Sequence, residues 1–223
     1  MNRQEEAIMY SPDEMEHLEA FIELSFGEIA YIFHEKVSED VHFDIAVIEP
    51  TDNDDYYKLV SMGGGAYKMN VPPGFEGELD RAELVMLLPK DSGFEKDDPA
   101  SLWPIQKMLD ILKTPIRENS WIGYGHTFGD GTPLTDGTDM KTIGLVTACN
   151  KNYDVMRLKR EDKTINFYQM LPMYDEELHI KQKKGMQEFM HQLHDDDFPL
   201  MLNVKRPNRC KQRTRQMDRD MFH

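Results

Sequence analysis

The sequence has little cysteine, fewer basic than acidic residues and no long apolar run. Cys149 and Cys210 are the only cysteines in 223 residues, so no disulfide framework of the kind found in small secreted domains is expected. No apolar segment approaches the ~20 residues that span a bilayer, and the opening MNRQEEAIMY lacks the apolar run of a signal peptide. These absences favour a cytoplasmic protein in a reducing compartment.

Acidic residues dominate the charge. The chain has 41 Asp and Glu against 26 Lys and Arg, a formal net charge of −15. Residues 204–223 hold seven of the basic residues and only two acidic ones, a local charge of +5, which leaves −20 on residues 1–203. A body this acidic repels nucleic acid and anionic membranes and attracts basic proteins. We therefore expect a protein partner, and neither a nucleic-acid nor a membrane ligand.

The length fits one domain, and its first element is a helix. Ser11 is placed as the N-cap, Pro12 as the first helical residue, and Glu14 as the partner of Ser11 in a capping box. Residues 1–10 are then an N-terminal lead to this helix.

Short segments rich in β-branched and aromatic residues follow, each bounded by turn-forming residues. The predicted strands are 28–35, 42–50, 56–62, 82–89, 142–149 and 164–171. Leucine and isoleucine at helical spacing predict a helix over 102–112, and a last helix runs from about 174 to 193, where Gly185 can break it.

The order of these elements indicates the fold class. Strands cluster rather than alternate strictly with helices, which is typical of an α+β domain with a mainly antiparallel or mixed sheet and flanking helices. We expect a single domain over residues 11–203. Residues 204–223 form a basic C-terminal tail without apolar periodicity, separable from the domain.

The stretch WIGYGHTFGDGTPL (121–134) is the strongest candidate for a functional loop. His126 with Asp130 behind it could form an acid–base pair, and this supports a hypothesis of a hydrolase or metal-dependent enzyme. No nucleophile accompanies the pair at a fixed spacing, and a histidine before a Gly-Asp-Gly turn is more typical of a structural turn. Tyr124, His126 and Asp130 are therefore candidate binding residues, and no catalytic residue is assigned.

Two other patterns are weaker. His191 and His194 lie three residues apart on the predicted last helix and could share a metal ion, but no third ligand accompanies them at a fixed spacing. The glycines of MGGGAYKMN (62–70) are not followed by a helix pattern, as a phosphate-binding loop requires, so a wide turn or a bulged strand is expected there. No cofactor and no metal are predicted.

Several segments together resemble the suppressor of fused domain, over roughly residues 15–207. The segments are DIAVIEP (44–50), YKLVSMGGGAYKMNVP (57–72), RAELVMLLP (81–89), WPIQKMLDILKTPIRENSWIGYGHTF (103–128) and INFYQMLPMYDEELHIKQKKGMQEFM (165–190). In that family the tryptophan strand leading into GHT belongs to the framework and has no known catalytic role.

This resemblance implies protein binding without catalysis. The animal relatives hold a transcription factor by letting a short peptide add as a strand. Short bacterial members are thought to be immunity proteins that neutralise a toxin encoded beside them. We therefore expect a non-catalytic immunity protein that binds a basic toxin or a peptide segment of it, with the enzyme centred on His126 and Asp130 as the alternative. The sequence leaves a homodimer open.

Overall fold

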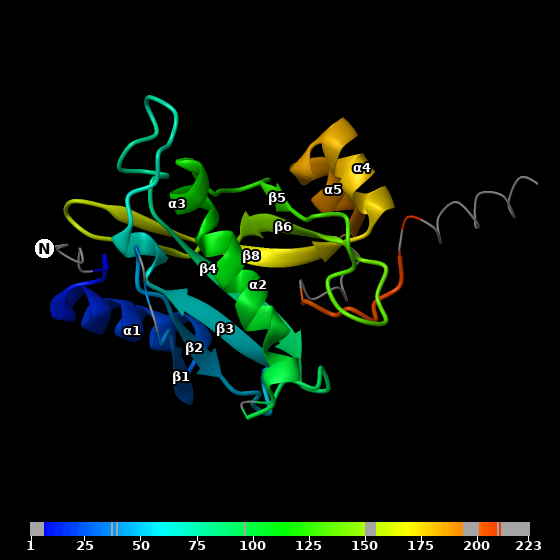
Figure 1. Ribbon diagram of the computed structural model, residues 1–223, viewed down its shortest axis with the longest axis horizontal. Coiled ribbons are helices and arrows are strands. Elements are labelled where there is room, and N and C mark those ends of the chain that lie inside the picture. The colour runs from blue at the N-terminus through cyan, green and yellow to red at the C-terminus, as the bar shows by residue number, and fades with distance from the viewer. Residues whose placement is uncertain are drawn as a thin grey trace, which may run out of the picture.

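The computed structural model describes residues 7–36, 38, 40–95, 97–149, 155–193, 201–208 and 210. They form one mixed sheet with helices on both of its faces (Figure 1). The strands are β1 (Tyr31–His34), β2 (Asp44–Ile48), β3 (Tyr56–Met62), β4 (Ala82–Pro89), β5 (Thr127–Phe128), β6 (Thr142–Thr147), β7 (Arg157–Lys159) and β8 (Thr164–Met173). The helices are α1 (Pro12–Phe26), α2 (Trp103–Leu112), α3 (Thr114–Glu118), α4 (Asp175–Lys184) and α5 (Met186–Leu193), with 3₁₀ turns η1 (Gly64–Ala66) and η2 (Pro99–Leu102). The predicted α+β class is confirmed.

The strand order is β1-β2-β3-β4-β8-β6-β5, with β7 pairing β8 on the same side as β6. All pairs are antiparallel except β4 with β8. The six predicted strands all exist. Two further strands, β5 and β7, are only two and three residues long, too short to carry a recognisable alternation.

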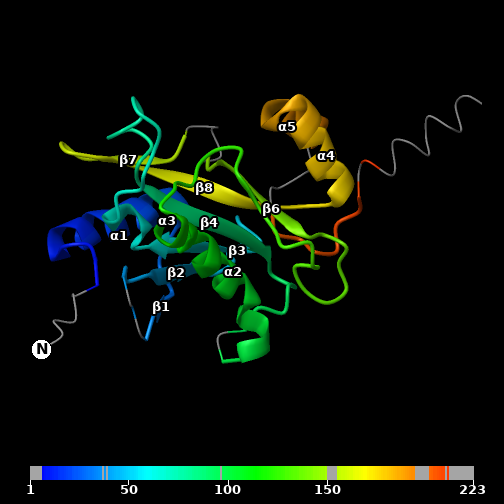
Figure 2. The same ribbon diagram turned by 45° about the horizontal axis from the view of Figure 1, so that its top comes forward.

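The two faces of the sheet are covered by different helices (Figures 1 and 2). On β4, Leu84 and Met86 point into the core beneath α2, whereas Val85 points into the core beneath α1. The pair α4–α5 packs on Leu171 and Met173 of β8 through a third cluster. Because β8 contributes to all three clusters, it is the central strand of the core.

The helix ends lie where the sequence signals predict them. The Ser11 hydroxyl accepts a hydrogen bond from the Glu14 N–H at 3.3 Å, and the Ser11 N–H donates to the Glu14 carboxylate at 2.8 Å, which completes the capping box. Gly185, with φ of +88°, separates α4 from α5. A left-handed φ is easily adopted only by glycine, so the break lies at that residue.

Residues 201–208 pack beside the later part of β4. The pairing of β4 with β8 ends at Val85, which leaves the later part of β4 without β8 as a neighbour. The Leu202 N–H donates to the Leu87 carbonyl at 2.7 Å, and the Tyr174 hydroxyl donates to the Arg206 carbonyl. The first residues of the predicted tail are thus packed on the body, whereas residues 211–223 lie outside the described residues.

Candidate functional site

The loop that contains Tyr124 forms one wall of a cavity of about 250 Å³. The other walls come from the strands β6, β7 and β8 and from the segment that precedes β4. The lining residues are Leu79, Trp121, Tyr124, Thr147, Met156, Arg157, Asn166, Phe167 and Tyr168. An apolar, aromatic lining with a few polar groups is typical of a ligand pocket. We call it the aromatic cavity.

Glycines allow the loop to fold around the Trp121 ring. A side chain at position 123 would place its Cβ 2.5 Å from Trp121 Cζ3, so glycine is required there. The Trp121 ring meets the His126 ring edge-on, with centroids 4.3 Å apart. Gly125 has φ of +83° and turns the chain away from the sheet just before β5. The glycine-rich composition of the loop therefore has a structural cause.

Within the described residues, this turn leaves a position on the outer edge of β6 without a backbone partner. Leu145 exchanges backbone hydrogen bonds with the loop, accepting from Gly125 N–H at 2.8 Å and donating to the His126 carbonyl at 2.9 Å. Backbone groups of alternate residues point to the same edge of a strand, so the next outward position is Thr147. If this register continued, Tyr124 would pair with Thr147. The chain turns at Gly125 instead, so Tyr124 does not take this position.

The Thr147 backbone lies beside the aromatic cavity. Its carbonyl accepts a long contact from Cys149 Sγ at 3.6 Å, and no hydrogen bond from its N–H is present within the described part of the chain. Tyr124 is 47% exposed at the same site. An open sheet edge thus adjoins a pocket lined by aromatic side chains.

His126 and Asp130 do not form the predicted acid–base pair. Asp130 accepts hydrogen bonds from the Thr132 N–H at 2.8 Å and from its hydroxyl at 2.6 Å, which lowers the pKa of that exposed carboxyl. Burial, followed by the positive charge of Lys181, lowers the pKa of His126. No hydrogen bond or ion pair between His126 and Asp130 occurs in the described chain. The enzyme hypothesis gains no support from this geometry.

The second histidine pattern is only partly visible. His191 is exposed on α5, and His194 lies outside the described residues. Within the described ranges, no three His, Cys, Asp or Glu side chains are grouped so that they could hold a metal ion.

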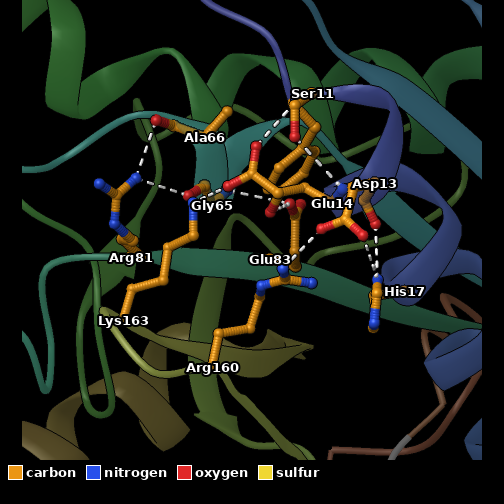
Figure 3. Close-up of polar contacts among 11 residues, drawn as sticks. Ser11, Asp13, Glu14, His17, Gly65, Ala66, Arg81, Glu83, Arg160 and Lys163 are labelled. Atoms are coloured by element: carbon orange, nitrogen blue, oxygen red, sulfur yellow. Dashed lines mark hydrogen bonds and ion pairs between the residues drawn. The ribbon is translucent and has the colours of Figure 1, made fainter.

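A buried carboxylate explains the triple glycine (Figure 3). Glu83 is completely buried, and its Oε1 accepts hydrogen bonds from Tyr10 Oη at 2.7 Å, Gly63 N at 3.0 Å and Gly65 N at 2.9 Å. The Ser61 hydroxyl donates to Oε2. Burial raises the pKa of Glu83, although these hydrogen bonds favour its ionised form. The glycine N–H groups thus bind the protein's own carboxylate, and the segment forms a 3₁₀ turn rather than a bulged strand.

Sequence reasoning missed the role of Glu83, although a signal was present. Glu83 is the single charged residue within the otherwise apolar run AELVMLLP of β4. A charge in a fully buried strand needs hydrogen-bond donors around it, because its desolvation is costly. Tyr10, in the predicted N-terminal lead, supplies one of these donors and attaches the lead to the core.

Ion pairs surround this cluster and connect α1 with the β7–β8 hairpin (Figure 3). Lys163 pairs with Glu14, and Arg160 pairs with Asp13 at 2.7 Å. Burial opposes the ionisation of Glu14, but hydrogen bonds from Lys163 and Ser11 outweigh it and lower the pKa of Glu14 to about 2.

The same region supports the aromatic cavity. Asn166 of β8 lines the cavity, and its Nδ2 donates to the Glu78 carbonyl at 2.6 Å. Its N–H donates to the Arg81 carbonyl at 3.1 Å. These bonds fix the segment that carries Leu79, which forms another part of the wall.

Comparison with known proteins identifies relatives of this chain. The family model described as "Suppressor of fused protein (SUFU)" matches residues 39–207. No curated protein sequence matches significantly. In the described part of the chain, no helix is long and apolar enough to cross a membrane.

Solved structures share the fold. A SUFU homolog from Neisseria gonorrhoeae matches with a TM-score of 0.61 and 15% identity, over 87% of this chain and 93% of its own. The protein in a Sufu–Fu complex matches with a TM-score of 0.63 and 11% identity, over 91% and 93%. Drosophila Suppressor of Fused matches with a TM-score of 0.65 and 12% identity, over 91% of this chain but only 52% of its own. At these identities the likeness shows the fold alone.

Proposed function

Because the chain belongs to the suppressor of fused family, we propose that it is a non-catalytic protein-binding domain that captures an extended segment of a protein partner at the aromatic cavity. The observation that carries this proposal is the edge of β6 at Thr147, whose N–H has no partner among the described residues and which lies beside Trp121 and Tyr124. One relative has been solved as the Sufu–Fu complex, which supports protein binding as the kind of activity.

The geometry suits the addition of a strand. An extended segment can exchange main-chain hydrogen bonds with Thr147 and insert one side chain between the aromatic rings of the cavity. The main-chain bonds supply affinity, and the pocket selects the side chain. An apolar or aromatic side chain fits the lining best, since Arg157 is the only charged residue among the described residues of the cavity.

We further propose that the partner is a cognate toxin, so that the chain acts as an immunity protein. The net charge of −15 favours a basic partner and would raise the rate of association with it. A bacterial protein among the structural relatives is consistent with this role. Occupying a segment of the toxin would neutralise it without any chemistry by the chain.

The test is co-expression with the product of the adjacent gene, with cell growth and co-purification as readouts. Tyr124→Arg introduces a bulky charge at the mouth of the cavity. Phe75→Arg is the matched control, because both aromatic residues are 47% exposed and Phe75 is not part of the cavity. The wild type and Phe75→Arg should rescue growth, and Tyr124→Arg should weaken binding by at least ~30-fold, as expected for a hot spot.

Two outcomes would contradict the proposal separately. If the wild-type chain neither binds nor rescues, the immunity role is wrong. If it does both and Tyr124→Arg behaves like Phe75→Arg, the chain binds its partner at another surface.

A further inference from the structure

A second and larger cavity, of about 510 Å³, lies near the N-terminal end of α2. We call it the acidic cavity. The two cavities have no described residue in common. Its walls come from the end of β4 and the loop after it, from η2 and the start of α2, from residues 135–136 and from the C-terminal segment 202–205. A volume of this size is within the range of sites that bind small ligands or single side chains.

The lining combines an apolar, aromatic part with carboxylates. Phe94 is buried, and Trp103 is partly exposed and packs against the same core. Three aspartates line the cavity, Asp91, Asp98 and Asp136, and all are exposed. Among the described lining residues Lys205 is the only basic one, so this part of the lining carries a net negative charge.

The carboxylates are available to a ligand. Asp98 uses Oδ1 to accept a hydrogen bond from the Ala100 N–H at 3.0 Å, which caps η2. The side chains of Asp91 and Asp136 form no hydrogen bond or ion pair with any other described residue. An anionic ligand would be repelled, and a neutral apolar ligand would cover these charges without compensating them.

We propose that the acidic cavity binds an arginine side chain presented by a basic segment of a protein partner. The guanidinium group is planar, carries five N–H donors and can stack on an aromatic ring while it pairs with carboxylates. Aromatic residues and aspartates within one cavity match both properties, whereas a lysine ammonium ion lacks the planar group that stacks on a ring and the fork of donors that pairs with two carboxylate oxygens. The inference rests on the proposed function in assigning the arginine to a protein partner.

The cavity would act as a second point of attachment. A partner held at the aromatic cavity by an extended segment would gain specificity from an arginine placed elsewhere on its surface. The acidic cavity would therefore select among partners that all satisfy the first site.

The test measures binding of a minimal probe to the full chain by fluorescence. The chain has two tryptophans, so Trp121→Phe leaves Trp103, in the wall of the acidic cavity, as the only tryptophan reporter. The probes are N-acetyl-arginine amide, its lysine counterpart, and the citrulline counterpart, which has nearly the same shape as arginine but no charge. Arginine should bind most tightly, lysine more weakly, and citrulline at least ~10-fold more weakly than arginine, given the loss of its ion pairs.

Matched variants locate the site. Asp91→Asn with Asp136→Asn should weaken arginine binding about 10-fold and reduce its dependence on salt, as expected for two partly exposed ion pairs. Asp52→Asn with Asp139→Asn changes the net charge equally at exposed positions outside the cavity and should change binding less than about twofold.

Several results would overturn the inference: no arginine binding, equal binding of citrulline, or equal effects of the two double variants. These results are independent of the toxin, so they leave the proposed function standing. Conversely, arginine binding together with failure of growth rescue would keep the acidic cavity as an arginine site and remove the immunity role.

Discussion

Arg206 forms a buried, bidentate ion pair with Glu177. Arg206 Nη1 lies 2.6 Å from Glu177 Oε1, and Nη2 pairs with Oε2. The two side chains are 3% and 0% exposed. Glu177 also accepts the Tyr174 N–H at 2.9 Å at the start of α4. The ion pair therefore links the C-terminal segment 201–208 to α4, the helix that follows β8.

Removal of Arg206 should destabilise the fold strongly. Arg206→Ala would leave the Glu177 carboxylate buried without its ion pair, at a cost of about 3–5 kcal/mol in the free energy of unfolding. Lys205→Ala, at an exposed neighbouring position, should change it by less than about 0.5 kcal/mol. Urea unfolding followed by circular dichroism measures both, and equal values would show that the pair does not hold the segment.

Truncation should show where the folded body ends. A chain ending at Asn208 keeps Arg206, whereas a chain ending at Asn203, the boundary predicted from charge, loses it. The shorter chain should melt at a clearly lower temperature than the full chain, and the longer one should melt like the full chain. Thermal denaturation compares the three, and identical melting of both truncated chains would assign residues 204–208 to a separable tail.

Glu83 should make stability depend on pH. Its carboxyl titrates near 4.5 when unfolded and at a higher pH when folded, so between these values the folded state holds a proton that the unfolded state has released. The stability of the wild type should therefore fall as pH rises through this window. Glu83→Gln, which keeps an acceptor for Tyr10 and the glycines, should lack this contribution.

The control for Glu83 is Glu16→Gln on the exposed side of α1, which should retain the wild-type slope. Glu83→Ala leaves the two glycine N–H groups and the Tyr10 hydroxyl without an acceptor, and should cost at least ~3 kcal/mol. Denaturant unfolding across pH 4–8 gives these values. A wild-type slope in Glu83→Gln would assign the pH dependence to other groups.

His126 should titrate below its ordinary pKa of 6.5 because it is partly buried and near Lys181. Lys181→Ala should raise the pKa of His126, whereas Asp130→Asn should leave it unchanged, since no bond joins the two residues. Titration of the imidazole by NMR measures these shifts. A pKa that falls in Asp130→Asn would show that the carboxylate acts on the ring, as the enzyme hypothesis requires.

The sequence by itself determined the local elements of this fold. The capping box of Ser11 and Glu14, the break at Gly185 and the β-branched and aromatic runs that mark six strands depend on residues close together in the chain. The family could also be recognised from the sequence, because its motifs cover most of the domain.

Only the tertiary structure decided which distant residues meet. The parallel pairing of β4 with β8 brings together strands separated by the whole segment from α2 to β7, and no local pattern encodes that choice. The contact of Glu83 with Tyr10 spans 73 positions, and that of Arg206 with Glu177 spans 29. His126 and Asp130 are only four residues apart, yet a turn at Asp130 and the packing of Trp121 keep them from pairing. Proximity in sequence therefore suggested a site that the packing does not form, whereas the two cavities arise from segments that the chain order keeps apart.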